Sequence, residues 1–197
     1  SALELPPSRV RGWLDGGMPD VVRALQVARD RDWLPFTPDS NPGRGLSGLC
    51  AWIYAGGSID VTRYVPLFAV GSDTERDRLQ TLTDTAGVEL AVSREGEAGR
   101  AEEYRPAEYA PVLGRVLAAL GCPVGEKSTD TTVVVPGFLT DAPTRTRRVF
   151  VATYLDLRGH IEDTDNHERL RLREARSERY LRSLANLFSD VLDADVW

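Results

Sequence analysis

The sequence predicts an α/β (α+β) protein made of two related halves, each ordered helix, strand, strand, helix, strand, strand, helix, with the second half incomplete. One observation is a segment that occurs twice: residues 46–59 and 148–161 are short apolar stretches that run into Gly-x-Ile, and they begin 102 positions apart. A second is that each copy is followed by extended, alternating patterns and then by a helical one. This ordered recurrence indicates a pseudo-two-fold fold with antiparallel strands.

Length and composition place the chain among ordinary globular proteins. Its 197 residues are 42% hydrophobic and 27% charged, enough for one core or for two small halves that share one. No apolar run approaches the roughly 20 residues of a membrane span. The N-terminus also lacks a basic region followed by an apolar stretch. We therefore expect a cytoplasmic protein that makes no membrane contact.

Few residues suited to metal binding or redox chemistry are present. Cys50 and Cys122 lie in apolar settings and are predicted to be reduced core residues. His160 and His167 lack the spacing of a zinc site. The formal charge is −6, and Lys127 is the only lysine among 24 basic residues. An acidic chain can still bind nucleic acid where its arginines gather on one face, because the local field meets the phosphates.

Residues 1–42 are predicted to form an N-terminal helical segment with two short helices. The second helix starts after Pro19, and its apolar residues recur at helical spacing. Residues 8–14 are similar to the recognition-helix end of a helix-turn-helix module, although the first helix of such a module is absent. The alternative is a pair of packing helices that precede the repeats.

The first repeat and its connector are predicted to span residues 43–142. Gly56-Gly57 ends its first helix, and Ser72 with Glu75 forms a capping box at the start of its second. Pro111 opens the third helix. The expected helices are 45–55, 73–86 and 111–120, and the expected strands are 58–63, 64–71, 89–94 and 103–105, followed by a connector over 122–142.

The second repeat is predicted to span residues 143–197. It restarts with helix 144–157, strands 160–164 and 168–174, and the amphipathic helix 177–192. Only Asp195-Val196-Trp197 of a further strand follows, so this copy is expected to be truncated. An unpaired sheet edge near Trp197 would then invite a protein partner.

The two recurring segments resemble the LAGLIDADG motif of homing endonucleases, and the resemblance extends over residues 43–197. It rests on the two apolar helices, their Gly-x-Ile exits, and the Val133-to-Leu139 connector. It implies paired motif helices above a saddle-shaped antiparallel sheet that lies on double-stranded DNA. It also implies one acidic metal ligand just before the last glycine of each motif, where this sequence has Gly56 and Arg158.

These replacements predict that the chemistry of the resembled family is lost. A guanidinium stays protonated and repels a divalent ion, so we expect no catalytic residues, no metal and no cofactor. Asp156 does not compensate, because two residues along a helix turn a side chain by roughly 200°. An alternative is a homing endonuclease that binds Mg²⁺ through the displaced acids Asp60 and Glu162.

The strand 168–174 gives the clearest signal of binding. Strict alternation places Arg169, Arg171 and Arg173 on one face, which the resemblance directs to the major groove. The alternative is a solvated face with acidic partners. Arg158 would either hold a phosphate or form a salt bridge with Asp60 or Glu162.

The sequence therefore predicts a catalytically inactive protein that binds double-stranded DNA, either as a regulator or as an intein-derived domain. Its expected DNA-binding residues are Arg158, Arg169, Arg171 and Arg173. Two alternatives stay open: an active metal-dependent homing endonuclease, and a protein-interaction domain of a larger assembly.

Overall fold

The computed structural model describes residues 17–96, 100–127, 133–164, 167–172 and 174–193, without the side chains of 161–169. Its elements confirm the predicted α/β class, and those from α3 to α5 follow the expected order αββαββα. In chain order they are α2 (Asp20–Asp30), α3 (Asn41–Ala55), β1 (Ser58–Ile59), β2 (Pro66–Val70), α4 (Asp73–Ala86), β3 (Leu90–Arg94), β4 (Glu102–Pro106), α5 (Ala110–Ala119), the 3₁₀ turn η1 (Gly137–Thr140), α6 (Thr144–Arg158), β5 (Gly159–Thr164), β6 (His167–Leu172) and α7 (Glu178–Leu192).

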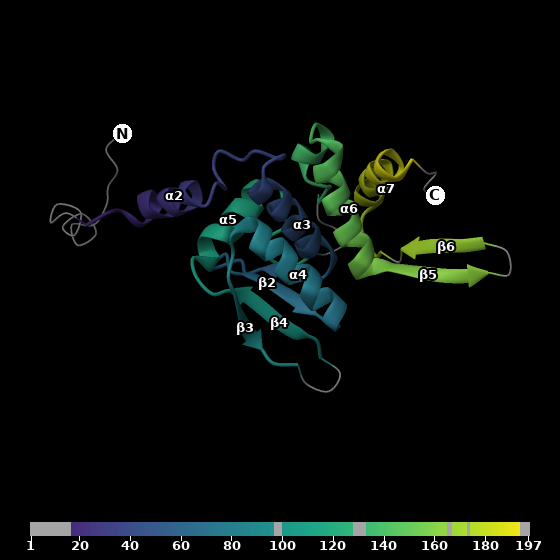
Figure 1. The fold of residues 1–197 in the computed structure, drawn as a ribbon, viewed down its shortest axis with the longest axis horizontal. Coiled ribbons are helices and arrows are strands. Elements are labelled where there is room, and N and C mark those ends of the chain that lie inside the picture. The colour runs from purple at the N-terminus through teal and green to yellow at the C-terminus, as the bar shows by residue number, and fades with distance from the viewer. Residues whose placement is uncertain (1–16, 97–99, 128–132, 165–166, 173, 194–197) are drawn as a thin grey trace.

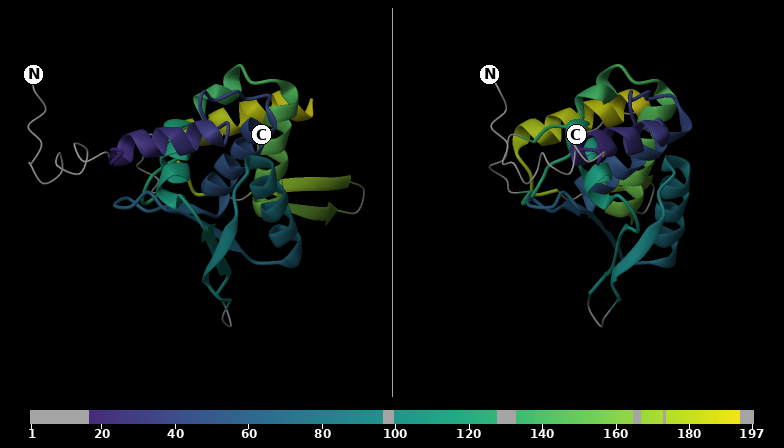
Figure 2. Two further views of the ribbon diagram at one scale, coloured as in Figure 1. Left: turned by 60° about the vertical axis from the view of Figure 1, so that its left-hand side comes forward. Right: turned by 90° about the vertical axis from the view of Figure 1, so that its left-hand side faces the viewer.

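The strands of the described ranges form two separate sheets. The larger has the order β1-β2-β4-β3, and its neighbouring strands are antiparallel. The helices α3, α4 and α5 all contact β2 and so cover one face of this sheet. The smaller sheet is the β5–β6 hairpin, which extends from the end of α6 away from the larger sheet (Figures 1 and 2).

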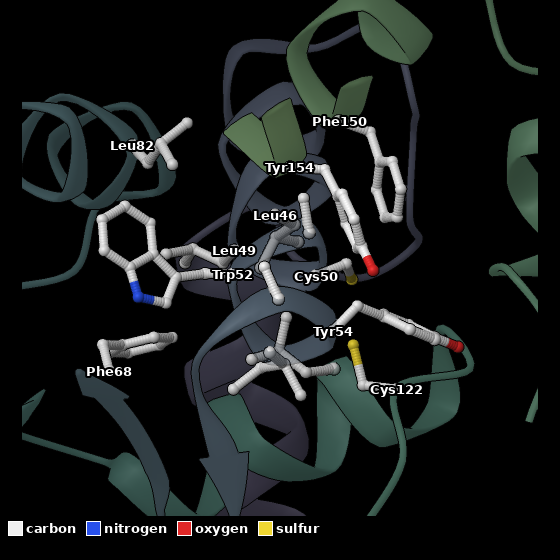
Figure 3. Packing of buried hydrophobic residues seen from close by; sticks show 14 of the residues in the cluster. Leu46, Leu49, Cys50, Trp52, Tyr54, Phe68, Leu82, Cys122, Phe150 and Tyr154 are labelled. Atoms are coloured by element: carbon white, nitrogen blue, oxygen red, sulfur yellow. The ribbon is translucent and has the colours of Figure 1, made fainter. Parts of the chain in front are cut away.

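Helix α3 lies at the centre of the core. Every residue from Gly45 to Ala55 is buried, as expected for a helix that is apolar on all sides. Figure 3 shows Trp52 and Phe68 on one side of this helix and Tyr54, Phe150 and Tyr154 on the other. Side chains from both repeats therefore pack around α3.

The two motif helices α3 and α6 pack side by side, as the resemblance implies. Ser47 of α3 donates a hydrogen bond of 3.2 Å to the carbonyl of Thr146 in α6. The Tyr54 ring meets Phe150 of α6 edge-on at 6.1 Å and stacks on Tyr180 of α7 at 5.8 Å. A small polar contact at one end and aromatic packing at the other hold the pair together.

The first hairpin is shorter than predicted. Strands were expected over 58–63 and 64–71, but β1 ends at Ile59 and β2 begins at Pro66. Asp60 explains the difference, because its carboxylate accepts hydrogen bonds from the backbone N–H groups of Thr62 at 3.1 Å and Arg63 at 2.6 Å. This side chain stabilises a turn in place of further strand pairing.

Local capping accounts for helix boundaries that agree with prediction. The Ser72 hydroxyl accepts from the Glu75 N–H at 3.2 Å, and the Glu75 carboxylate accepts from the Gly71 N–H at 2.6 Å. These contacts supply partners at the start of α4, which spans the predicted residues 73–86. Helix α3 instead begins four residues early, at Asn41, because Ser40 caps it and Pro42 occupies its first turn.

The N-terminal part of the chain contributes α2 to the fold. The segment 8–14, similar to a helix-turn-helix end, lies outside the described residues. On α2 only Ala28 is buried, whereas Val21, Val22 and Leu25 are exposed. Val21 and Leu25 line an apolar groove of about 780 Å³ between α2 and α5. The described helices include none with the length and apolar character needed to cross a bilayer.

Gly45 permits the close approach of α3 to α4. A Cβ at this position would lie 2.6 Å from the backbone nitrogen of Ala86 and 2.8 Å from the carbonyl oxygen of Leu82. We expect Gly45→Ala to lower the free energy of unfolding by about 2 kcal/mol, although alanine has the higher helix propensity. Urea denaturation followed by circular dichroism measures this change.

Gly56→Ala is the matched control, because a Cβ there would meet nothing within 4 Å. Its free energy of unfolding should stay within about 0.5 kcal/mol of the wild type. Equal effects of the two substitutions would contradict this account of the α3–α4 packing.

Candidate functional site

The C-terminal end of α3 lies inside the protein, so its last four carbonyl groups need partners from outside the helical backbone. The carbonyl of Trp52 accepts from the backbone N–H groups of Gly56 at 2.9 Å and Gly57 at 2.7 Å. The next three carbonyls, those of residues 53, 54 and 55, each accept from a cationic side chain. Side chains therefore complete this helix end where backbone amides cannot.

Lys127 provides the first of these partners. Its ammonium group donates to the carbonyls of Ile53 and Gly57. It reaches them from the connector that follows α5, 74 and 70 positions away in sequence. The only lysine of the chain thus joins the end of α3 to the segment that leads into β1.

Two arginines of the second repeat provide the other partners. Arg158, the last residue of α6, donates through Nε at 2.7 Å and through Nη2 to the carbonyl of Ala55. Arg176 donates to the carbonyl of Tyr54 at 3.3 Å and to that of Lys127 at 2.9 Å. We call Lys127, Arg158, Arg176 and the neighbouring Glu174 the helix-end cluster.

Glu174 is the carboxylate of this cluster. Its side chain is only 7% exposed, and its two oxygens lie 3.6 Å from Nε of Arg158 and of Arg176. It also accepts a 2.7 Å hydrogen bond from the hydroxyl of Tyr154, which accepts one of 3.0 Å from Tyr180. A buried polar chain therefore runs from the aromatic core to the helix-end cluster.

The helix-end cluster carries more positive than negative charge, and burial is the main cause of the pKa shifts in and beside it. Burial, followed by repulsion from Arg176 and Arg158, lowers the pKa of Lys127 from 10.5 to about 8. Burial also raises the pKa values of Tyr154 and Tyr180 far above the usual range of a phenol. The negative end of the α3 dipole favours the cations at this place.

Within the described residues, Arg158 does not pair with Asp60, one of its two predicted partners. Asp60 instead accepts from the backbone of its own turn and lies 3.8 Å from Arg63. The acid that faces Arg158 is Glu174. Asp156 points away from the cluster, as expected, because it binds Arg78 of α4 at 2.8 Å. The side chain of Glu162 lies outside the described part.

The residues at this end do not fit the divalent metal that the resemblance implies. Gly56 offers no side chain, and Arg158 places a guanidinium at the second ligand position. The carboxylate of Glu174 is already occupied by two arginines and a tyrosine. Among the described residues, no three His, Cys, Asp or Glu side chains gather closely enough to hold a metal ion. Magnesium needs free oxygen ligands, which this arrangement lacks.

Two residues of the predicted arginine face, Arg169 and Arg171, lie on β6 of the hairpin. Arg171 is exposed on β6, and its backbone is paired with that of His160, also exposed, on β5. Arg169 occupies the same strand, opposite Glu162, but its side chain lies outside the described part, and so does the whole of Arg173. Arg158, whose side chain is 42% exposed, directly precedes this hairpin.

Sequence reasoning missed three members of the helix-end cluster: Lys127, Glu174 and Arg176. The available signal was Lys127, because a single lysine in a chain with 24 basic residues is unusual. Arg176 carried no comparable signal, since it is one arginine among many. Its role depends on tertiary contacts with Tyr54, 122 positions earlier in the chain.

Comparisons with known proteins found similarity among solved structures. No family model and no curated protein matches the sequence. Among solved structures, the chain is similar to the crystal structure of the N-terminal LAGLIDADG domain of DUF199/WhiA. That similarity has a TM-score of 0.46 and 19% sequence identity, and it covers 82% of this chain and 70% of the other.

The lowered pKa of Lys127 predicts a rise of stability with pH. Between about 8 and 10.5 the unfolded chain holds a proton on this group that the folded protein has released. The free energy of unfolding should therefore increase over this window, by about 2 kcal/mol between roughly pH 7 and pH 9.5. A neutral amine keeps two N–H donors, so both carbonyl contacts survive the loss of the proton.

Lys127→Met isolates this effect, because every other titratable group is present in both proteins. The measurement is the difference in unfolding free energy between the wild type and the variant in urea, at several pH values. The wild type should gain stability over the variant as the pH rises. A difference that is constant or shrinks would contradict the pKa assigned to Lys127.

Proposed function

We propose that this chain binds double-stranded DNA without cleaving it, in a regulatory or architectural role. The observation that carries the proposal is the helix-end cluster. Its cations are bound to the carbonyls of α3 at the place where the resembled nucleases need two acidic ligands. The helix pair and the strands that follow it are kept, while the groups for metal-dependent hydrolysis are replaced.

The charge of this end supports binding in place of cleavage. Three cations surround one buried carboxylate, so the cluster presents a net positive field. A positive field in a partly dry site disfavours a divalent cation and favours a phosphate. The same substitutions that remove a nuclease thus leave a surface suited to the DNA backbone.

The β5–β6 hairpin is the proposed DNA-contacting element. It extends from the body of the protein next to Arg158, and its base carries the exposed side chains of His160 and Arg171 (Figure 1). A two-stranded ribbon fits the major groove, where arginine binds guanine or a phosphate. Arg169 and Arg173 belong to the same proposal through their positions along this segment.

Two arginines of the first repeat, on or next to the larger sheet, are paired with acids. On the larger sheet Arg94 pairs with Glu103 at 3.0 Å, and next to that sheet Arg76 of α4 pairs with Asp73 at 2.6 Å and with Glu102 at 3.0 Å. These ion pairs neutralise the positive charge of this region. Because the β5–β6 hairpin of the second repeat projects from the body of the protein (Figure 1), we place the main contact there, so that recognition is asymmetric.

Fluorescence anisotropy with a labelled random-sequence duplex tests the proposal. We expect binding at micromolar protein in low salt, with an affinity that falls steeply as salt rises. Arg171→Met should lower the slope of log K against log salt by about one, because one phosphate contact is lost. No binding by the wild type under these conditions would exclude the proposal.

Arg23→Met is the matched control, because Arg23 is exposed on α2, at the opposite end of the molecule from the hairpin (Figure 1). Its affinity and salt slope should equal those of the wild type. Incubation of plasmid DNA with Mg²⁺ or Mn²⁺ completes the test. Reproducible double-strand cuts by the wild type would overturn the non-catalytic assignment.

A further inference from the structure

The β5–β6 hairpin projects from the body of the protein (Figure 1). Within the described ranges it forms a two-stranded sheet of its own, paired along its whole length and not joined to the larger sheet. Leu170 remains 52% exposed, so the hairpin buries little apolar surface there. Isolated hairpins are marginally stable in water. Its direction relative to the rest of the protein must therefore be set at its base.

Both ends of the hairpin meet the same structure. Arg158 directly precedes β5, and Glu174 and Arg176 closely follow β6. Arg158 binds the carbonyl of Ala55, and Arg176 binds that of Tyr54. The chain therefore enters and leaves the hairpin at two consecutive carbonyls of α3.

This anchor also relates the hairpin to the larger sheet. Helix α3 runs directly into β1, and Lys127 links Ile53 of the helix to Gly57 just before that strand. Arg176 reaches both sides of this junction, because it donates to Tyr54 and to the carbonyl of Lys127. The two sheets are thus related through charged contacts at one helix end.

We infer that Arg176 is a positioning residue that sets the direction of the β5–β6 hairpin relative to the larger sheet. Its side chain is only 12% exposed and is held among Glu174, Tyr54 and the backbone of Lys127, so it acts through the hairpin and does not touch DNA. The expected effect on DNA affinity rests on the proposed function. The expected effect on the direction of the hairpin does not depend on DNA binding.

A small change at this anchor is amplified along the hairpin. Strand β5 has six residues, which at about 3.3 Å per residue extend roughly 20 Å. A tilt of about 10° at the base would move the far end by roughly 3.5 Å, more than the tolerance of a hydrogen bond. Loss of the anchor should therefore weaken contacts that lie far from Arg176.

Two substitutions distinguish a positioning role of Arg176 from an effect of its positive charge alone. Arg176→Met removes both the charge and the contacts, whereas Arg176→Lys keeps the charge but cannot reach the two carbonyls as a planar guanidinium does. We expect both variants to bind the duplex about tenfold more weakly, equivalent to one charge-assisted hydrogen bond. The slope of log K against log salt should stay as in the wild type, because no phosphate contact is lost.

Amide hydrogen exchange without DNA gives an independent measure. In both Arg176 variants the amides of 159–164 and 167–172 should exchange about tenfold faster, whereas those of α3 and α4 stay protected. Arg23→Met, which lies on α2 and leaves the hairpin and its anchor intact, should show wild-type exchange. If Arg176→Met fails to fold, the lysine variant still provides both measurements.

Three results would overturn the inference: unchanged exchange of the hairpin, a reduced salt slope, or full recovery of affinity in Arg176→Lys. The last two would make Arg176 a charge that meets DNA directly. If the wild type binds no DNA, the proposed function fails, while the exchange experiment still decides whether Arg176 positions the hairpin.

Discussion

A helix that ends inside a protein leaves its last carbonyl groups without amide partners, and in this protein that helix is α3. Burying such oxygens unpaired would cost about 1–3 kcal/mol each, a large share of the stability of a domain. The carbonyls of Ile53, Tyr54 and Ala55 are paired through Lys127, Arg176 and Arg158. Because these donors come from the connector and from both sides of the hairpin, completing one helix joins the two repeats.

The same contacts determine which chemistry this end can perform. Cations are favoured at the negative end of the α3 dipole, and they occupy the space that paired acids would need to hold a metal. Glu174 balances part of their charge but is itself held by Tyr154 and the two arginines. The proposed function follows from this arrangement, because a helix end completed by cations is suited to an anion rather than to a divalent metal.

The sequence predicted those parts of the fold that depend on local patterns. The bounds of α4 and α6 agree with prediction within a residue, because apolar spacing and, for α4, a capping box mark them. The strands of the first hairpin were predicted to be longer than they are, because strand propensity does not report the turn that the Asp60 side chain stabilises. The helix-end cluster was largely missed for a different reason. Lys127 and Arg176 meet α3 only through tertiary contacts, which no local pattern reports.

Arg158 illustrates what sequence patterns can and cannot predict about a site residue. The repeat located it at the end of the second motif helix, and its positive charge was enough to exclude it as a metal ligand. Asp60, one of its two expected acidic partners, is bound within its own turn, and among the described side chains the acid that faces Arg158 is Glu174. Spacing along the sequence thus identified the residue, and only the three-dimensional path of the chain identified its contacts.

The account depends most directly on Lys127 being a buried partner of α3 beside two arginines. Because the chain has a single lysine, ¹⁵N-lysine labelling gives one side-chain ammonium signal, whose chemical shift can be followed from pH 6 to 11 by NMR. The account predicts a titration midpoint of about 8. A midpoint near 10.5, the ordinary value for a solvated lysine, would contradict it.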